Sequence, residues 1–137
     1  MALTDIGKSM TINIRQIEMY KADPADLPEF LFDLHRQFGE CADLLRVAKI
    51  EDTVVAGYAL TSALDARGYF CLDWIAVSPE LRRQGLGRWV IGHAMGVAES
   101  KSGGGLRTPR VEQAEFFQRL GFASADGGGW QLEFLPE

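Results

Sequence analysis

One stretch, Arg82-Arg83-Gln84-Gly85-Leu86-Gly87, constrains the fold of this 137-residue chain more than any other. It follows an apolar run that is typical of a β-strand, Tyr69 to Val77, and it leads into an amphipathic run that is typical of a helix, Leu86 to Glu99. The first backbone N–H groups of a helix have no partner within the helix and attract anions. A strand, a short turn and a helix start in this order therefore predict a phosphate site.

The residue types in this stretch support the same prediction. Gly85 and Gly87 carry no Cβ atom that would keep a phosphate group away from the backbone. Positive charge is supplied by Arg82, Arg83 and Arg88. A dinucleotide-binding site of the Rossmann type is disfavoured, because Val90 stands where its third glycine is due, and the Gly-Lys-Ser/Thr ending of a P-loop is also absent.

The length of the chain fits one domain, and we expect residues 11–137 to form it after a loose leader at 1–10. The leader lacks the apolar core of a signal peptide, and no apolar run reaches the ~20 residues that cross a bilayer. Cys41 and Cys71 match no metal or redox spacing. We therefore expect no metal, no membrane and a reducing, cytoplasmic setting.

The charges divide the chain into an acidic and a basic part. The net charge of −5 argues against a nucleic-acid partner. Residues 20–43 carry six acidic and two basic side chains, whereas residues 82–119 carry seven basic and three acidic ones. This asymmetry suits an anionic cofactor at one end and a cationic substrate at the other, although solvated surface charges would produce the same counts.

The first part of the chain predicts a strand and a helix. Apolar and polar residues alternate over Thr11 to Ile17, which indicates a half-buried strand. Asp26 and Glu29 are spaced as a capping box, and Gly39 is placed to end the helix in a left-handed conformation. One face of this helix is apolar: Leu27, Phe30, Leu31, Leu34 and Phe38. His35 falls off this face, and we expect it at the surface or edge.

The middle of the chain predicts three strands. Leu44–Ile50 and Thr53–Thr61 are separated by Glu51-Asp52, which indicates a hairpin. Tyr69–Val77 is apolar at nearly every position, so we expect it at the centre of the sheet and covered on both faces. Asp73 is the exception, and a carboxylate at such a place is costly unless it is paired or lines a wet cleft.

The last part predicts a short strand at Leu106–Thr108, a helix from Val111 to Leu120 and a closing hairpin of 122–124 with 130–134. Gly121 is the expected helix C-cap, with Phe122 packed back onto the last turn. The complete order is strand, helix, three strands, helix, strand, helix, two strands. This order predicts an α+β domain around a mixed, largely antiparallel sheet.

Two motifs in this order resemble the GNAT superfamily of N-acyltransferases. The first is Asp73 to Gly87, a strand that leads into Arg-x-x-Gly-x-Gly, and the second is Ala114 to Phe122, a helix with an aromatic pair before Gly-Phe. The resemblance covers nearly the whole chain after the leader. It implies a GNAT-like fold that opens beside the strand before the loop, and transfer of an acetyl group from acetyl-CoA to a primary amine of a small molecule, peptide or protein.

The resemblance also implies the residues that bind acetyl-CoA. Backbone groups that pair with the pantetheine arm are expected at Ile75, Ala76 and Val77. Groups that hold the pyrophosphate are expected at Arg82, Arg83, Gln84, Gly85, Leu86, Gly87 and Arg88. Phe117 is expected to pack against the pantetheine, and Asp73 is the candidate catalytic base.

The chain departs from the family pattern at Phe117, where a tyrosine usually protonates the departing thiolate, and at Val111, where asparagine is frequent. Tyr58 and Tyr69 are spare hydroxyl groups with no predicted position near the sulfur. The alternative is therefore an acyl-CoA-binding module without turnover. Either a monomer or a homodimer is compatible with the sequence.

Overall fold

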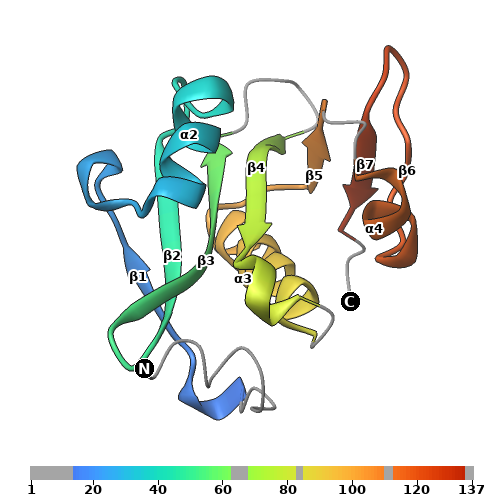
Figure 1. Cartoon of the computed structure of the whole chain (residues 1–137). Helices are drawn as coiled ribbons and strands as arrows, with labels where there is room; N and C mark the ends of the chain where they lie inside the picture. Colours follow the sequence, from blue (N-terminus) through green and yellow to red (C-terminus); the bar gives the residue numbers. More distant parts are fainter. Residues whose placement is uncertain (1–13, 63–67, 83–84, 110–112, 135–137) are drawn as a thin grey trace.

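The computed structural model describes residues 14–62, 68–82, 85–109 and 113–134 (Figure 1). In these residues a 7-stranded sheet has the order β1-β2-β3-β4-β5-β7-β6. Neighbouring strands are antiparallel except β4 and β5, which are parallel. The fold is thus the predicted α+β arrangement.

The strands are β1 (Glu18–Lys21), β2 (Leu44–Ile50), β3 (Thr53–Thr61), β4 (Tyr69–Val77), β5 (Gly105–Thr108), β6 (Ala123–Ser124) and β7 (Trp130–Glu133). The α-helices are α2 (Glu29–Phe38), α3 (Leu86–Ser100) and α4 (Ala114–Arg119), and the short 3-10 helices are η1 (Ile14–Gln16), η2 (Pro24–Asp26) and η3 (Pro79–Leu81). The predicted bounds of β2, β3 and β4 are confirmed. Glu51 and Asp52 join β2 to β3 with φ of 48° and 68°, as a tight hairpin with both central residues left-handed requires.

The first strand was predicted in the wrong place. Ile14–Gln16 forms η1, and positions 11–13 lie outside the described residues. Pairing with β2 begins at Glu18, which is opposite Lys49, and continues to Lys21. Ile17 enters the core just before the strand. The alternation therefore identified a buried residue correctly but not the segment that pairs.

The start of α2 also differs from the prediction. Asp26 belongs to η2 and makes no capping bond, whereas Pro28 precedes the first residue of α2. A proline disfavours helical backbone in the residue before it, and Leu27 is extended, with ψ of 137°. The capping box of Asp26 and Glu29 therefore does not form. Gly39 has φ of −108°, so its predicted left-handed conformation is wrong as well.

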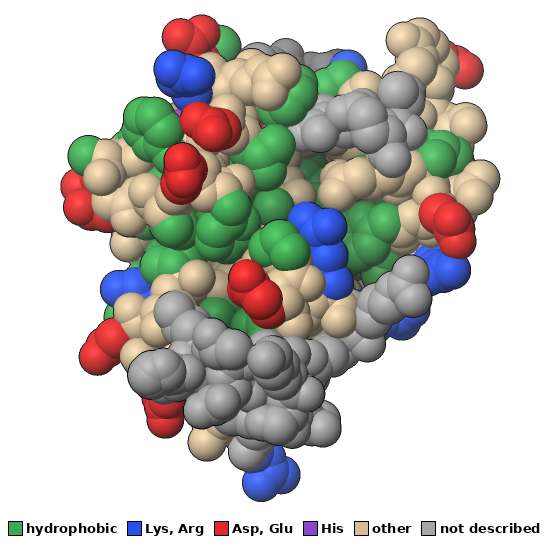
Figure 2. Space-filling view, in the orientation of Figure 1, with side chains coloured by type: hydrophobic (Ala, Val, Ile, Leu, Met, Phe, Trp, Pro, Cys, Tyr) green, Lys and Arg blue, Asp and Glu red, His purple; other side chains and the backbone are tan. Residues whose placement is uncertain are grey.

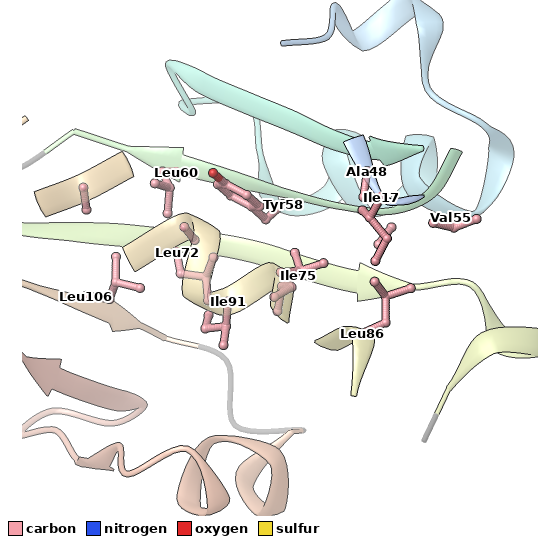
Figure 3. Packing of buried hydrophobic residues seen from close by; sticks show 14 of the residues in the cluster. Ile17, Ala48, Val55, Tyr58, Leu60, Leu72, Ile75, Leu86, Ile91 and Leu106 are labelled. Atoms are coloured by element: carbon pink, nitrogen blue, oxygen red, sulfur yellow. The ribbon is translucent and has the colours of Figure 1, made fainter. Parts of the chain in front are cut away.

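Helices cover both faces of β4, as predicted. On one face α3 packs onto the sheet through Leu86, Val90, Ile91, Ala94 and Ala98. Figure 3 shows Leu86 and Ile91 beside Leu72 and Ile75 of β4. On the other face α2 supplies Leu31, with Phe30, Leu34 and Phe38 around it, and packs against Trp74.

Asp73 interrupts the pairing of β4 with β3. Ala59 is opposite Trp74 and the next residue, Leu60, is opposite Leu72, so Asp73 is an extra residue in a β-bulge. Leu72 and Ile75 both pack towards α3. The bulge thereby leaves Asp73 and Trp74 on the face that α2 covers.

Strands β4 and β5 pair over a short length only. Tyr69, Phe70 and Cys71 are paired with β5, and the rest of β4 up to Val77 continues without this neighbour. Figure 1 shows the two strands with α4 on the far side of β5. One edge of the second half of β4 is therefore released from the sheet.

The end of the chain confirms the predicted closing hairpin, formed by β6 and β7. Gly121 has φ of 92°, and its N–H bonds to the carbonyl of Gln118, as expected of a helix C-cap. Phe122 packs onto Phe117 with ring centroids 5.1 Å apart. The predicted first residues of this helix, 111 and 112, lie outside the described part. No helix among the described residues is both long and apolar enough to cross a membrane.

Candidate functional site

A cavity of about 580 Å³ lies along the released half of β4. Strand β4 lines it with Ile75, Ala76 and Val77, and α2 reaches it with Leu34. In the space-filling view, basic atoms lie in the middle of this face with hydrophobic atoms on either side (Figure 2). The cavity therefore combines an apolar wall with positive charge.

The positive end of the cavity is built where β4 gives way to α3. Gly85 is the N-cap of α3 with φ of 83°, and its carbonyl accepts the N–H of Trp89 at 3.1 Å. The backbone N–H groups just before Trp89 have no acceptor within the helix. Gly87 and Arg88 line the cavity at this point, whereas the side chain of Leu86 is buried in the core.

Arg82 also belongs to the positive end. Its Nε donates a 3.3 Å hydrogen bond to the carbonyl of Val77, which holds the exposed side chain over the end of β4. Arg83 and Gln84 lie outside the described residues. The structure thus brings together, around one cavity, these predicted residues: Ile75, Ala76, Val77, Arg82, Gly85, Gly87 and Arg88.

The opposite wall comes from α4 and the residues on either side of it. Gln113, Phe116, Arg119 and Leu120 line the cavity there. Phe116 lies against Gly87, where an added Cβ atom would be only 3.1 Å from the ring. Gly87 thus allows α4 to approach α3 closely.

Phe117 lies elsewhere than expected from the resemblance. Its side chain is 1% exposed and belongs to the core between α3 and the sheet, and it is not among the residues that line the cavity. The neighbouring Phe116 lines the cavity instead. No sequence signal distinguishes these two aromatic residues, because they are adjacent and identical.

Asp73 lies on the face of the sheet that α2 covers. Its carboxylate accepts hydrogen bonds from the Thr61 hydroxyl at 2.7 Å and from the Cys71 thiol at 3.4 Å. Burial raises the pKa of Asp73, the two hydrogen bonds and His35 oppose the rise, and Asp43 adds to it, so that the pKa is higher than that of an ordinary aspartate. The carboxyl group of Asp73 therefore holds its proton more tightly than that of an ordinary aspartate.

Next to Asp73 lies a hydrogen-bonded pair of side chains, Trp74 and His35, that the sequence analysis did not predict. Trp74 Nε1 donates a 3.0 Å hydrogen bond to His35 Nδ1, and the two rings meet edge to face. His35 is half-buried at the last turn of α2, which is close to its expected place at an edge. Its hydrogen bond to Trp74 was not predicted. Because 39 positions separate the two residues in the sequence, local periodicity could not pair them.

The spare tyrosine hydroxyls do not line the cavity. Tyr58 is buried on the face that α3 covers, and its hydroxyl is 2.8 Å from Nδ1 of His93 (Figure 3 shows Tyr58). Burial raises the pKa of Tyr58 far above its usual value. Tyr69 lies at the end of β4 where the pairing with β5 is intact. Neither hydroxyl is placed to act in the cavity.

Comparison with protein families identifies this architecture. The sequence model of the acetyltransferase (GNAT) domain matches residues 42–124, more than half of the chain. The chain belongs to the GNAT acetyltransferase family. The predicted resemblance is thereby confirmed, and no curated protein matches the sequence.

Solved structures of GNAT proteins share the fold. An IAA acetyltransferase from Bacillus cereus is 22% identical, with 80% of this chain and 78% of that one covered and a TM-score of 0.65. A GNAT family acetyltransferase from Elizabethkingia anophelis with acetyl-CoA bound is 19% identical over 81% and 78% of the two chains, at a TM-score of 0.65. A GNAT family acetyltransferase from Brucella melitensis in complex with acetyl-CoA is 18% identical, with 88% of this chain and 90% of that one covered and a TM-score of 0.63.

Proposed function

We propose that this chain binds acetyl-CoA and transfers its acetyl group to the nitrogen of an amine. The observation that carries the proposal is the release of β4 from β5 after Cys71, with a cavity along the released residues that is basic at the end of the strand. Membership of the GNAT acetyltransferase family and the acetyl-CoA bound in two structures of similar fold support the same ligand.

The described residues fit the groups of acetyl-CoA. Arg82, Arg88 and the N-terminal N–H groups of α3 offer positive charge and donors to a diphosphate, and Gly85 leaves open space around its Cα atom. The free edge of β4 from Ile75 to Val77 offers backbone groups to an extended amide chain, as an added strand would use them. Phe116 supplies an apolar surface beside this path, and Phe117 supports it from the core.

Acetyl-CoA supplies the acetyl group as a thioester, and the side chains of the protein manage protons. Asp73 accepts a proton from the acceptor ammonium or, through water, from the attacking amine as the C–N bond forms and the C–S bond breaks. Neither Phe116 nor Phe117 has a proton to give to the departing thiolate, so we assign that proton to water. The acidic segment at 20–43 supports an acceptor with positive charge.

A second candidate is an acyl-CoA-binding module that does not transfer. It is favoured by Phe117, because the usual tyrosine is absent and no described tyrosine hydroxyl lines the cavity. Both candidates predict binding of acetyl-CoA, and only the first predicts a product.

Calorimetric titration with acetyl-CoA, followed by thiol release with a panel of amines, tests the proposal. Binding with thiol release that depends on one amine class is the expected result. Binding without release for every amine would support the second candidate. No binding by the wild-type chain would contradict both, and Arg82→Glu serves as the variant in which binding should be lost.

A further inference from the structure

The hydrogen bond between Trp74 and His35 fixes which nitrogen of the imidazole carries hydrogen. An indole N–H can only donate, so His35 Nδ1, 3.0 Å away, must accept with its lone pair. A neutral imidazole that accepts at Nδ1 carries its hydrogen on Nε2. In the described part of the protein, no side chain or backbone group accepts this Nε2–H. His35 is half-buried and therefore presents one oriented N–H donor to its surroundings.

Two glycines leave the space that the indole of Trp74 fills. Trp74 is 1% exposed. At one end of the indole, a Cβ atom at Gly57 of β3 would lie 3.3 Å from Cη2. At the other end, a Cβ atom at Gly39 would lie 2.8 Å from Nε1 and would overlap the ring of His35. Gly39 has an ordinary negative φ, so its lack of a side chain serves space rather than backbone conformation. The direction of the indole N–H is thus set by close packing.

The donor lies beside the candidate base. Trp74 follows Asp73 at the β-bulge, and both side chains lie on the face covered by α2. His35 is hydrogen-bonded to Trp74, the residue next to Asp73. The residue before His35, Leu34, lines the cavity. A carboxylate and an N–H donor therefore lie on the same face of the sheet, next to residues that line the cavity.

We propose that His35 positions the acceptor by donating its Nε2–H to an oxygen atom that the acceptor carries next to its reacting nitrogen. The inference rests on the proposed acetyl transfer and names the class of acceptor: α-amino amides, including the first residue of a peptide. The nitrogen of such a molecule faces Asp73 and its carbonyl oxygen faces His35. An alkylamine offers the nitrogen alone, and it leaves the N–H of His35 without a partner in the complex.

Kinetics with two amines test this inference. Glycinamide carries the oxygen and propylamine lacks it. Their different basicities cancel when the ratio of their kcat/KM values is compared between variants. His35→Asn keeps an acceptor for Trp74 but removes the outer donor, and we expect it to lower this ratio about tenfold, chiefly through the KM of glycinamide. His35→Gln returns a donor near the position of Nε2 and should restore part of the ratio.

His93→Asn is the matched control. His93 also forms a hydrogen bond through Nδ1, to Tyr58, but on the opposite face of the sheet. We expect it to leave the ratio unchanged. An equal effect of His35→Asn on the two amines would overturn the inference.

Nitrogen-15 spectra of histidine give a second readout that does not need turnover. The sequence contains 2 histidines, so His93→Asn assigns the signals of His35. We expect the imidazole of His35 to be a single tautomer with its hydrogen on Nε2. In Trp74→Phe we expect a mixture of the two tautomers. With CoA present, glycinamide should shift the Nε2 signal and propylamine should not. A mixture in the wild-type protein, or equal shifts, would contradict the positioning of an acceptor by His35. If the glycinamide shift appears without acetylation of any amine, the proposed transfer fails and the binding site stands.

Discussion

The Thr61 hydroxyl donates a 2.7 Å hydrogen bond to the Asp73 carboxylate across the pairing of β3 with β4. This bond favours the charged form of Asp73, whereas burial disfavours it more strongly, and the pKa is raised above 3.8 as a result. The affinity of Asp73 for a proton is therefore a balance between its burial and its immediate neighbours. Each side of this balance can be changed by mutation.

Asp73→Asn should lower kcat by about a hundredfold or more, because a positioned base typically contributes ~10²–10⁴-fold. The affinity for acetyl-CoA should be unchanged, since Asp73 is not among the residues that line the cavity. The wild-type rate should rise with pH through the raised pKa, and the rate of the variant should lack this step. Steady-state kinetics over a pH series provide the measurement. Equal rates of the two proteins at every pH would exclude Asp73 from the reaction.

The same substitution should change how stability depends on pH. The folded pKa of Asp73 is above the unfolded value near 3.8, so the folded state holds the proton more tightly. The contribution of this group to stability is complete below the unfolded pKa and is lost as the pH rises through the folded pKa. The Tm of Asp73→Asn relative to that of the wild type should therefore increase from acidic to neutral pH. A calorimetric series that shows the opposite slope would mean that the pKa is lowered.

Thr61→Val should move the pH profile of the rate to higher pH. Valine matches the shape of threonine but cannot donate, so the pKa of Asp73 should rise further. Thr61→Ser keeps the hydroxyl and is the control, with a profile near that of the wild type. If Thr61→Val leaves the midpoint in place, then the group that titrates in the kinetics is not Asp73.

Arg82→Ala and Arg88→Ala should each weaken acetyl-CoA binding by roughly tenfold, the size expected for one charge-assisted hydrogen bond. The loss should be smaller at high salt, because salt screens exposed charges. Arg36 is exposed on α2 and is not among the residues that line the cavity, so Arg36→Ala is the matched control. Isothermal titration at two salt concentrations measures all three. A loss of equal size in the control would indicate a general effect of net charge.

Phe117→Tyr should not restore a tyrosine at the reaction centre. The ring of Phe117 is 1% exposed, and a hydroxyl added there without a partner costs about 1–3 kcal/mol of stability. Phe116→Tyr places the hydroxyl in a residue that lines the cavity and should be tolerated better. Denaturant unfolding and thiol release on both variants test this. Faster turnover in Phe117→Tyr with unchanged stability would show that position 117 reaches the thioester.

The sequence predicted those parts of the fold that local patterns decide. An apolar run of strand length identified β4, and a two-residue break between β-rich runs identified the hairpin of β2 and β3. The glycines and arginines after Val77 identified the positive end of the cavity, because a close approach to backbone N–H groups needs residues without Cβ atoms. In each case the physical cause lies within about ten neighbouring positions.

The wrong or missing predictions have two causes: a local steric effect that outweighed a matching pattern, and contacts between distant segments. The spacing of Asp26 and Glu29 fits a capping box, but Pro28 forces the preceding residue to be extended, and the stronger steric effect decides where α2 begins. The contact of His35 with Trp74 depends on how α2 lies over the sheet. The choice between Phe116 and Phe117 as the residue that lines the cavity depends on the rotation of α4.

The β-bulge at Asp73 adds one residue between two stretches of β4 that both pack against α3. Before it, Phe70 and Leu72 supply the core under α3, and after it Ile75 and Val77 do so. If residue 73 were deleted, Leu72, Trp74 and Ile75 would follow one another in regular alternation, and each would keep the face that it has now. The carboxylate is therefore an insertion in an otherwise regular strand. Its loss by deletion, as by substitution, should leave both cores in place.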